Sequence, residues 1–184
     1  MKKRSVLRGF GFVLAATLTA PAMAAVMVGG AAMYPSRNII QNAVHSKEHT
    51  TLVSAVKEAG LVQTLEGQGP FTVLAPTNRA FDKLPHGTVA NLMEPKNKSE
   101  LKTILTYHVL PGRFTTQELR DRIRAGDGKA TINTVEGQPL TFTERGSQIL
   151  VTDEKGDVAE ITQANVMQSN GVIQVINSVL MPNS

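Results

Sequence analysis

Cysteine and tryptophan are absent from this chain of 184 residues, and aromatic residues make up only 4% of it. Without cysteine there can be no disulfide framework, although an oxidising compartment would permit one. The scarcity of large aromatic side chains means that stability depends on the packing of Val, Ile, Leu and Ala. The chain is still long enough to form one domain with a sizeable core.

The sequence also has no apolar run long enough to span a membrane. Three basic residues at positions 2–4 precede an apolar segment from Gly9 to Ala20 and the small residues Ala22-Met23-Ala24. This three-part pattern is typical of a secretory signal. The apolar segment is too short to cross a bilayer about 30 Å thick as a helix. Because no cysteine follows it, a lipoprotein-type anchor is excluded. We therefore expect residues 1–24 to be a cleaved signal peptide and the mature protein to be periplasmic or secreted, with no membrane span.

Without residues 1–24, the chain has no excess of positive charge. Four of the 19 basic residues lie within residues 1–24, which hold no acidic residue, so 15 basic and 15 acidic residues remain. A nucleic-acid-binding protein needs a positive field to attract phosphates. We therefore expect no nucleic-acid partner.

The rest of the sequence divides into a helical half and a strand-forming half. Residues 25–35 are rich in Gly, Ala and Met and carry no charge, which predicts a flexible lead-in before a single domain over residues 36–184. Apolar spacing and capping patterns predict helices over residues 36–43, 50–59, 87–93, 99–105 and 115–124. Alternating residues predict strands over 130–135, 140–143, 148–152, 158–166, 172–176 and 179–181. This segregation is typical of the α+β class.

The stretch GPFTVLAPTNRAFDKL, residues 69–84, is the most specific in the chain. Its apolar first half predicts a strand that is covered on both faces. Pro76 has no amide hydrogen and should end the strand's hydrogen bonding. Thr77 is suited to cap a following helix, in which Phe81 and Leu84 share a face that turns back onto the strand.

This stretch resembles the first signature of the fasciclin-like domain family. Two further signatures follow in the family's order, one in residues 104–112 and one in residues 170–182. With residues 51–60, the resemblance covers about Arg37 to Pro182. It implies an α+β fasciclin-like fold, which is a wedge-shaped sandwich of two β-sheets with about five or six helices packed along one side.

The resemblance also implies which residues carry the structural signature. They are Pro76, Thr77, Asn78, Phe81, Tyr107, His108, Asn170 and Gly171. This chain departs from the family pattern at two polar positions, where Gln174 replaces a common histidine and Asn177 replaces a common aspartate. The apolar residues around both positions are retained.

The pair Tyr107-His108 has two interpretations. A histidine flanked by apolar residues indicates a core position, and we expect its ring to hydrogen-bond the turn at residues 76–78. In animal matrix relatives this segment is implicated in integrin adhesion, so the resemblance marks Tyr107, His108 and Arg113 as a candidate interaction surface. A bacterial-type export signal argues against an integrin partner. The polar segment 84–98 is a further candidate for contact.

The order H-x-x-E-H in residues 45–49 is used by one class of zinc peptidases. That chemistry requires both histidines on one helical face, and here a break between two helices falls inside the motif. We therefore expect solvated loop residues and no metal site. No paired carboxylates and no nucleophile–base–orienter set can be identified, so we expect neither a catalytic site nor a cofactor.

Three functions remain open at this point. The leading hypothesis is an exported, non-enzymatic fasciclin-like domain acting in cell adhesion or extracellular protein–protein interaction, with an unknown protein or cell-surface partner and an undetermined oligomeric state. The alternative is a periplasmic protein that binds a small ligand in a pocket between sheet and helices, which an apolar cavity with a few polar groups would favour. A hydrolase is the third and is disfavoured by the lack of a catalytic set.

Overall fold

The computed structural model describes residues 25–183, and the predicted signal peptide, residues 1–24, lies outside them. Within this range the chain forms seven α-helices, one 3-10 helix and nine strands. The helices are α1 (Ile39–Ala43), α2 (Thr50–Glu58), α3 (Val62–Glu66), α4 (Asn78–Asp82), α5 (Thr88–Leu92), η1 (Pro95–Asn97), α6 (Lys98–Tyr107) and α7 (Thr116–Ala125). The strands are β1 (Val26–Val28), β2 (Ala31–Met33), β3 (Phe71–Pro76), β4 (Val109–Pro111), β5 (Lys129–Asn133), β6 (Pro139–Arg145), β7 (Gln148–Thr152), β8 (Val158–Gln168) and β9 (Gly171–Ile176).

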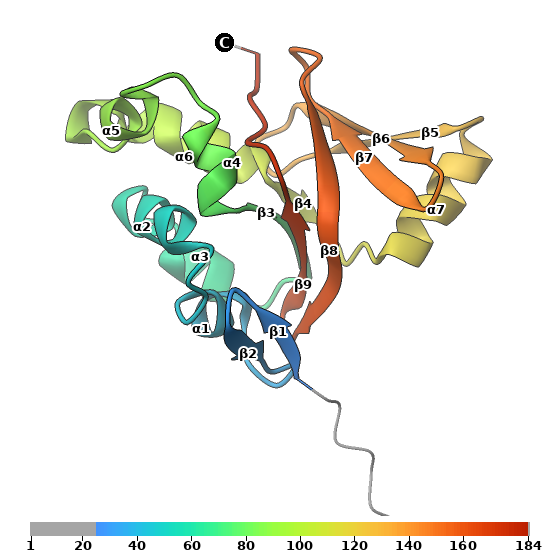
Figure 1. Ribbon diagram of the computed structural model, residues 1–184, viewed down its shortest axis with the longest axis horizontal. Coiled ribbons are helices and arrows are strands. Elements are labelled where there is room, and N and C mark those ends of the chain that lie inside the picture. The colour runs from blue at the N-terminus through green and yellow to red at the C-terminus, as the bar shows by residue number, and fades with distance from the viewer. Residues whose placement is uncertain (1–24, 184) are drawn as a thin grey trace, which may run out of the picture.

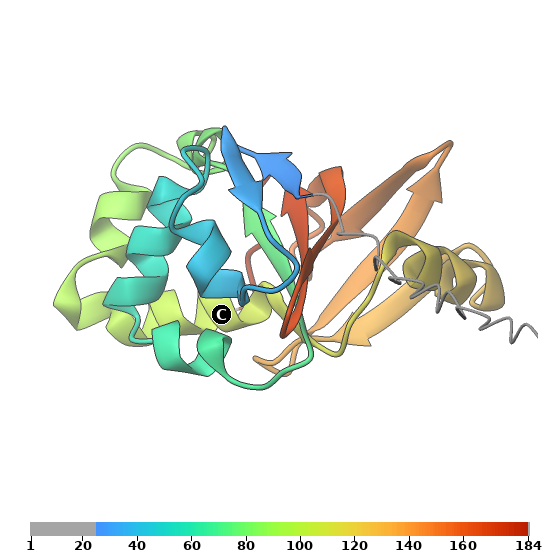
Figure 2. The ribbon, with the colours of Figure 1, turned by 90° about the horizontal axis from the view of Figure 1, so that it is seen from below.

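Seven strands form one hydrogen-bonded series in the order β4-β3-β9-β8-β7-β6-β5. Strands β3 and β9 are parallel and the other neighbours are antiparallel. The long strand β8 pairs with β7 through residues 158–160 and with β9 through residues 161–168, with register shifts between Ile161 and Val166. The two halves of the sheet diverge from this region (Figure 2). The predicted α+β class is confirmed, and the two predicted sheets are joined through β8.

Six of the seven α-helices lie on one side of the sheet, in line with the five or six that the resemblance implied, and α7 lies on the other side. Helices α1 to α6 gather on the side of β3, whereas α7 lies beside β5 and β6 at the opposite side of the molecule (Figure 1). Helix α7 buries Leu119 and Ile123 against that half of the sheet. The two halves of the sheet bury apolar residues of their own, so the domain needs helical cover on both sides.

Two hydrophobic cores result from the alternation of side chains along the central strands. Val73 and Ala75 of β3 face a core shared with α1 to α6, while Leu74 between them faces a core enclosed by the two sheet halves and α7. Successive side chains of a strand point to opposite faces. Both faces of β3 are therefore buried, which explains its nearly continuous apolar sequence.

The predicted flexible lead-in, residues 25–35, is wrong. Strands β1 and β2 form a hairpin there, and their residues Val28 and Met33 are only 3% and 2% exposed. The hairpin is held by the Gly29 carbonyl, which accepts a hydrogen bond from the Lys47 amide, and by the Met27 carbonyl, which accepts one from Gln163 Nε2. A short uncharged segment resembles a disordered one, but burial of its apolar side chains stabilises an ordered hairpin.

Candidate functional site

The Pro76 corner is built as the sequence predicted. Pro76 is the last residue of β3 and pairs with Ile176 of β9. Thr77 follows in an extended conformation, and its hydroxyl accepts a hydrogen bond from the Ala80 amide at 3.3 Å, which caps α4. Phe81 packs against the core shared with the helices. These contacts fix the direction in which α4 leaves the sheet.

Asn78 has a role that its position on a helix did not reveal. Its backbone amide donates to the Glu48 carbonyl at 2.7 Å, and its side-chain Nδ2 donates to the Lys47 carbonyl at 3.0 Å. Its Oδ1 accepts from the Thr51 amide at 3.1 Å. One side chain therefore fastens the loop between α1 and α2 to the corner. The contact joins residues about thirty positions apart, so no local pattern could indicate it.

A polar groove of about 480 Å³ runs over this corner. It is lined by Lys47, Glu48, Thr77, Asn78, Arg79, Lys83, Thr162 and Asn177. Three lining side chains are cationic and one is anionic. None of the four forms a salt bridge with another described residue. Lys83 Nζ donates to the Asn177 carbonyl at 2.6 Å, which ties α4 to the end of β9. The groove thus presents positive charge on a rigid base made by two of the signature segments.

Tyr107 does not belong to a contact surface. Its side chain is fully buried, and its hydroxyl donates to the Pro139 carbonyl at 2.9 Å and accepts from the Glu154 amide at 3.1 Å. Burial raises the pKa of Tyr107 to about 12. Tyr107 therefore connects α6 to the first residue of β6 and to the turn after β7, and its role is structural.

His108 is buried as expected, but its predicted partner is wrong. Its Nδ1 lies 2.8 Å from the Ile104 carbonyl, and its Nε2 accepts from the Leu180 amide at 3.0 Å. Since Nε2 must be unprotonated to accept, the proton is on Nδ1. The ring contacts the C-terminal segment rather than the 76–78 turn. That segment is not the strand predicted over residues 179–181, although Leu180 is fully buried.

The three residues of the predicted interaction surface are therefore not presented together. Tyr107 and His108 are 0% and 2% exposed, so a partner could not reach them. Arg113 is partly exposed, and its Nη2 donates to the Gln168 carbonyl at 3.3 Å. Exposed side chains that a partner could reach lie instead at the groove over the Pro76 corner, such as Lys47, Arg79 and Lys83. Residues 84–98, the other predicted contact segment, are mostly exposed.

Asn170 and Gly171 of the third signature join three parts of the helical half. Asn170 Oδ1 accepts from the Ile39 amide at 3.0 Å, and Nδ2 donates to the carbonyls of Leu65 and Gly67, both at 2.8 Å. These bonds connect α1 and α3 to the start of β9. A side chain at Gly171 would collide with the carbonyl oxygen of Phe71, so only glycine allows this approach of the two strands.

The two departures from the family pattern also have structural roles. Gln174 is fully buried, with its Oε1 accepting from the Asn165 amide at 2.8 Å and its Nε2 donating to the Phe114 carbonyl at 2.9 Å. Asn177 Oδ1 accepts from the Glu160 amide at 2.9 Å. Neutral amides thus satisfy backbone groups at both positions.

No metal centre or catalytic triad is assembled in residues 25–183. No group of three metal-ligating side chains lies together in this range. Of the H-x-x-E-H histidines, His45 is exposed, but His49 is 3% exposed and not solvated as predicted. Ser46 Oγ lies 2.8 Å from His49 Nδ1, but His49 Nε2 has no hydrogen-bond partner among the described residues. A serine nucleophile needs a base that a third group orients, and here that group is missing.

Comparison with known proteins agrees with this fold. The Fasciclin domain model matches residues 47–182. Protein sll1483 of Synechocystis is 40% identical over 156 residues, which cover 85% of this chain and 79% of that protein. Immunogenic protein MPB70 of Mycobacterium bovis is 32% identical and is covered over 89% of its length. The transforming growth factor-beta-induced protein ig-h3 of Sus scrofa is 39% identical, but this chain spans only 17% of it.

Among solved structures, a FAS1 domain pair from the insect cell adhesion molecule Fasciclin I superposes with a TM-score of 0.70 at 16% identity. The match covers 79% of this chain and 51% of that domain pair, so this chain spans about half its length. None of the helices described in residues 25–183 is long and apolar enough to cross a membrane. On the family match, its close relatives and the shared fold, this chain belongs to the fasciclin domain family.

Proposed function

We propose that this chain is an exported, non-enzymatic fasciclin domain that acts in cell adhesion by binding a protein partner at the groove over the Pro76 corner. The observation that carries the proposal is the groove's exposed positive charge on a rigid base. Lys47 and Arg79 are exposed. Asn78 binds the loop between α1 and α2, which contains Lys47, and so holds it in place. A preorganised surface loses less conformational entropy on binding.

The chemistry of the groove favours an acidic partner. Its three cationic side chains and single carboxylate attract an anionic surface, and such complementarity raises the association rate more than it raises affinity. The exposed segment 84–98 follows Lys83 directly and extends the available contact area. An acidic protein on the cell envelope or in the surrounding medium is the partner class that this surface fits.

The proposals of export and of a non-enzymatic role are supported by different observations. We infer export from the signal pattern of residues 1–24, and an adhesive role is proposed because the fasciclin domain family includes an insect cell adhesion molecule. The incomplete Ser46–His49 pair, buried and without an orienting carboxylate, supports a non-enzymatic role.

Reversing two charges in the groove tests the proposal. The double variant Lys47→Glu and Arg79→Glu should bind envelope preparations of the producing cell at least about tenfold more weakly, because like charges would face each other. The measurement is biolayer interferometry with mature protein at low and at physiological salt. The wild type should lose affinity as salt rises, since salt screens exposed charges.

The matched control is the double variant Lys102→Glu and Lys155→Glu, which makes the same change in net charge at exposed positions outside the groove. It should bind as the wild type does. Equal binding by the groove variant and the wild type would remove the basis for assigning contact to this surface.

A further inference from the structure

The groove over the Pro76 corner has room for part of a partner, whereas the apolar cavity in the helical half does not. That cavity lies among α1, α2 and the β1–β2 hairpin and measures about 50 Å³, close to the roughly 30 Å³ that one water molecule occupies in the liquid. It therefore does not provide the ligand pocket of the alternative function. The groove measures about 480 Å³, which is within the range of about 300–1,000 Å³ for small-molecule sites, so it can hold a short stretch of a larger partner.

All eight residues that line the groove are polar or charged. Besides its four charged side chains, the groove offers the hydroxyls of Thr77 and Thr162 and the amide of Asn177. Protein partners commonly insert an aromatic or aliphatic anchor into an apolar pocket, and the lining of this groove provides no such pocket. The part of a partner that fits here is therefore one that brings polar and charged groups.

Arg79 and Lys83 place two positive charges on one face of α4. They are four residues apart, and the Cβ atoms of residues at that spacing on a helix lie about 5–6 Å apart. Lys83 Nζ donates to the Asn177 carbonyl at 2.6 Å and to Ser178 Oγ at 3.2 Å. An ammonium group has three donors, so these two bonds fix the position of the charge and leave the third donor for a partner.

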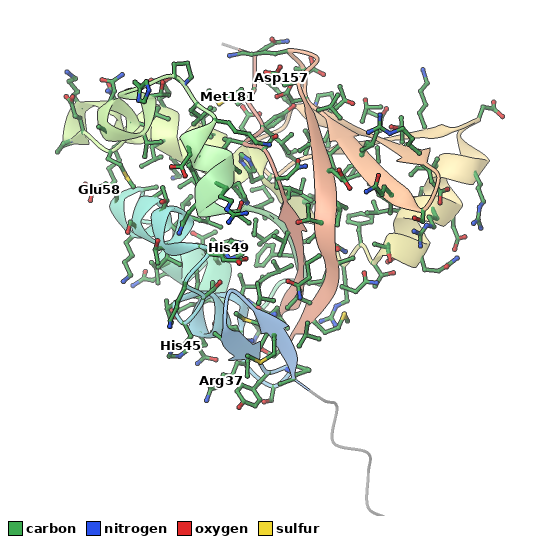
Figure 3. All side chains as sticks on the ribbon, in the orientation of Figure 1. Arg37, His45, His49, Glu58, Asp157 and Met181 are labelled. Carbon is green, nitrogen blue, oxygen red and sulfur yellow. The ribbon has the colours of Figure 1, made fainter. Side chains whose placement is uncertain are left out.

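The loop before α2 brings the other two charges to the same groove. Lys47 and Glu48 lie between the exposed His45 and His49, and the His49 side chain points in between the helices and the sheet (Figure 3). The Asn78 side chain and backbone bind the carbonyls of this loop. The Glu48 carboxylate is therefore part of a fixed lining. A partner with negative charge along its whole length would meet this carboxylate, and the repulsion disfavours a uniform polyanion.

The size of the groove favours an extended segment over a helical one. A helix with its side chains is about 10–12 Å across, so a stretch that carries two residues four apart occupies about 600 Å³ or more, which exceeds the groove. On an extended chain, side chains two residues apart point to the same side and lie about 6.5–7 Å apart. This spacing is close to that of Arg79 and Lys83, and long side chains can close the difference of about 1 Å.

We propose that the groove binds an extended, unfolded segment of the partner in which acidic residues alternate with neutral ones. Two acidic side chains on one side of the segment contact Arg79 and Lys83, while the neutral residue between them points away. Neutral residues beyond them avoid repulsion by Glu48. This inference rests on the proposed function and names the part of the partner that makes the contact.

Two capped eight-residue peptides of the same composition test this inference. In the first, four glutamates alternate with four serines. In the second, the glutamates form adjacent pairs separated by two serines, so that no two are two residues apart, although those four apart would share one face of a helix. Both are titrated into 15N-labelled mature protein at low salt, where exposed charges are least screened.

The alternating peptide should shift and saturate the backbone amide signals of residues 77–83 and should bind at least about threefold more tightly than the second peptide. The reason is that it forms two exposed ion pairs where the other forms one, and each contributes about 0.2–1 kcal/mol. Equal affinities, tighter binding of the second peptide, or no response of residues 77–83 would refute the proposal.

Two variants check that the spacing of the cations is responsible. Arg79→Gln should abolish the preference for the alternating peptide, because one cation of the pair is lost. Arg79 is exposed, so this change should not disturb folding. Lys102→Gln, at an exposed position on α6 outside the groove, should retain the preference. A preference that survives in Arg79→Gln would show that the pair does not read the segment.

Tetragalacturonate, which carries the same number of carboxylates on a sugar backbone, distinguishes an acidic glycan from an acidic protein segment. It should bind more weakly than the alternating peptide, and equal or tighter binding would assign the groove to a glycan and overturn the proposal. The proposed function is judged separately. If the two peptides bind alike while the double variant Lys47→Glu and Arg79→Glu still loses envelope binding, the groove remains the contact surface and the extended acidic segment alone is refuted.

Discussion

Lowering the pH from 7 to 4 is expected to reduce the free energy of unfolding by about 3 kcal/mol through His108 alone. Burial lowers the pKa of His108 to about 4 from its ordinary value of 6.5. Protonation of Nε2 would also remove the acceptor of the Leu180 amide. The unfolded chain binds this proton more readily than the folded protein does. Stability should therefore be greatest above pH 6.5 and should decrease as the pH falls toward 4.

Urea unfolding at a series of pH values measures this dependence. His108→Gln, which cannot titrate, should be less stable at pH 7 but should lose less stability on acidification, and the difference in slope isolates His108 from the carboxylates. An NMR titration of the folded protein should find the His108 ring still neutral at pH 5.5. A ring that titrates near pH 6.5 in the folded protein would contradict the burial and the hydrogen bonds described here.

Replacing Asn170 by alanine is expected to lower the free energy of unfolding by about 3–4 kcal/mol. The substitution removes three hydrogen bonds and leaves the buried Ile39 amide and Leu65 carbonyl without partners. Each unsatisfied buried group contributes about 1–3 kcal/mol, and the more exposed Gly67 carbonyl can turn to water. Urea unfolding at neutral pH, compared with the wild type, gives this number directly.

Asn97→Ala is the matched control for that substitution. Asn97 Nδ2 also donates two hydrogen bonds, to the backbone carbonyl and to Oδ1 of Asn91, but both contacts are exposed and local. Water can replace them, so the loss should be below about 1 kcal/mol. Similar losses in the two variants would show that Asn170 does not fasten α1 and α3 to β9.

Local signals in the sequence were enough to predict much of the fold. Pro76 ends its strand and Thr77 and Thr115 cap their helices as expected, because these effects depend on the residue and its immediate neighbours. The α+β class followed from the change in periodicity along the chain. The first helix begins at Ile39, later than the predicted residue 36, because Asn38 and Gln41 form its capping box.

The hydrogen-bond partners and burial that the sequence did not predict depend on long-range contacts. Leu180, which donates to His108, and Lys47, which accepts from Asn78, lie 72 and 31 positions away, so nothing adjacent to either residue identifies them. The pair Tyr107-His108 was assigned to a contact surface by resemblance, whereas the fold buries it. The unpartnered Nε2 of His49 emerged only when the hairpin, α2 and β3 were placed around it.

The groove and the buried pair Tyr107-His108 belong to one scaffold. The signature segments hold both halves of the domain together, and the charged side chains of the groove over the Pro76 corner are exposed while Tyr107 and His108 stay inside. In this account the most specific part of the sequence supports the contact surface, and the exposed cations beside it provide the contact.

Site-specific photo-crosslinking tests that claim most directly. A photo-reactive amino acid at position 79, in the groove, and another at position 155, in the exposed turn before β8, would be compared in exported protein on producing cells. The account predicts a discrete crosslinked partner from position 79 that is absent from position 155. Crosslinks to that same partner from position 155 alone would contradict it.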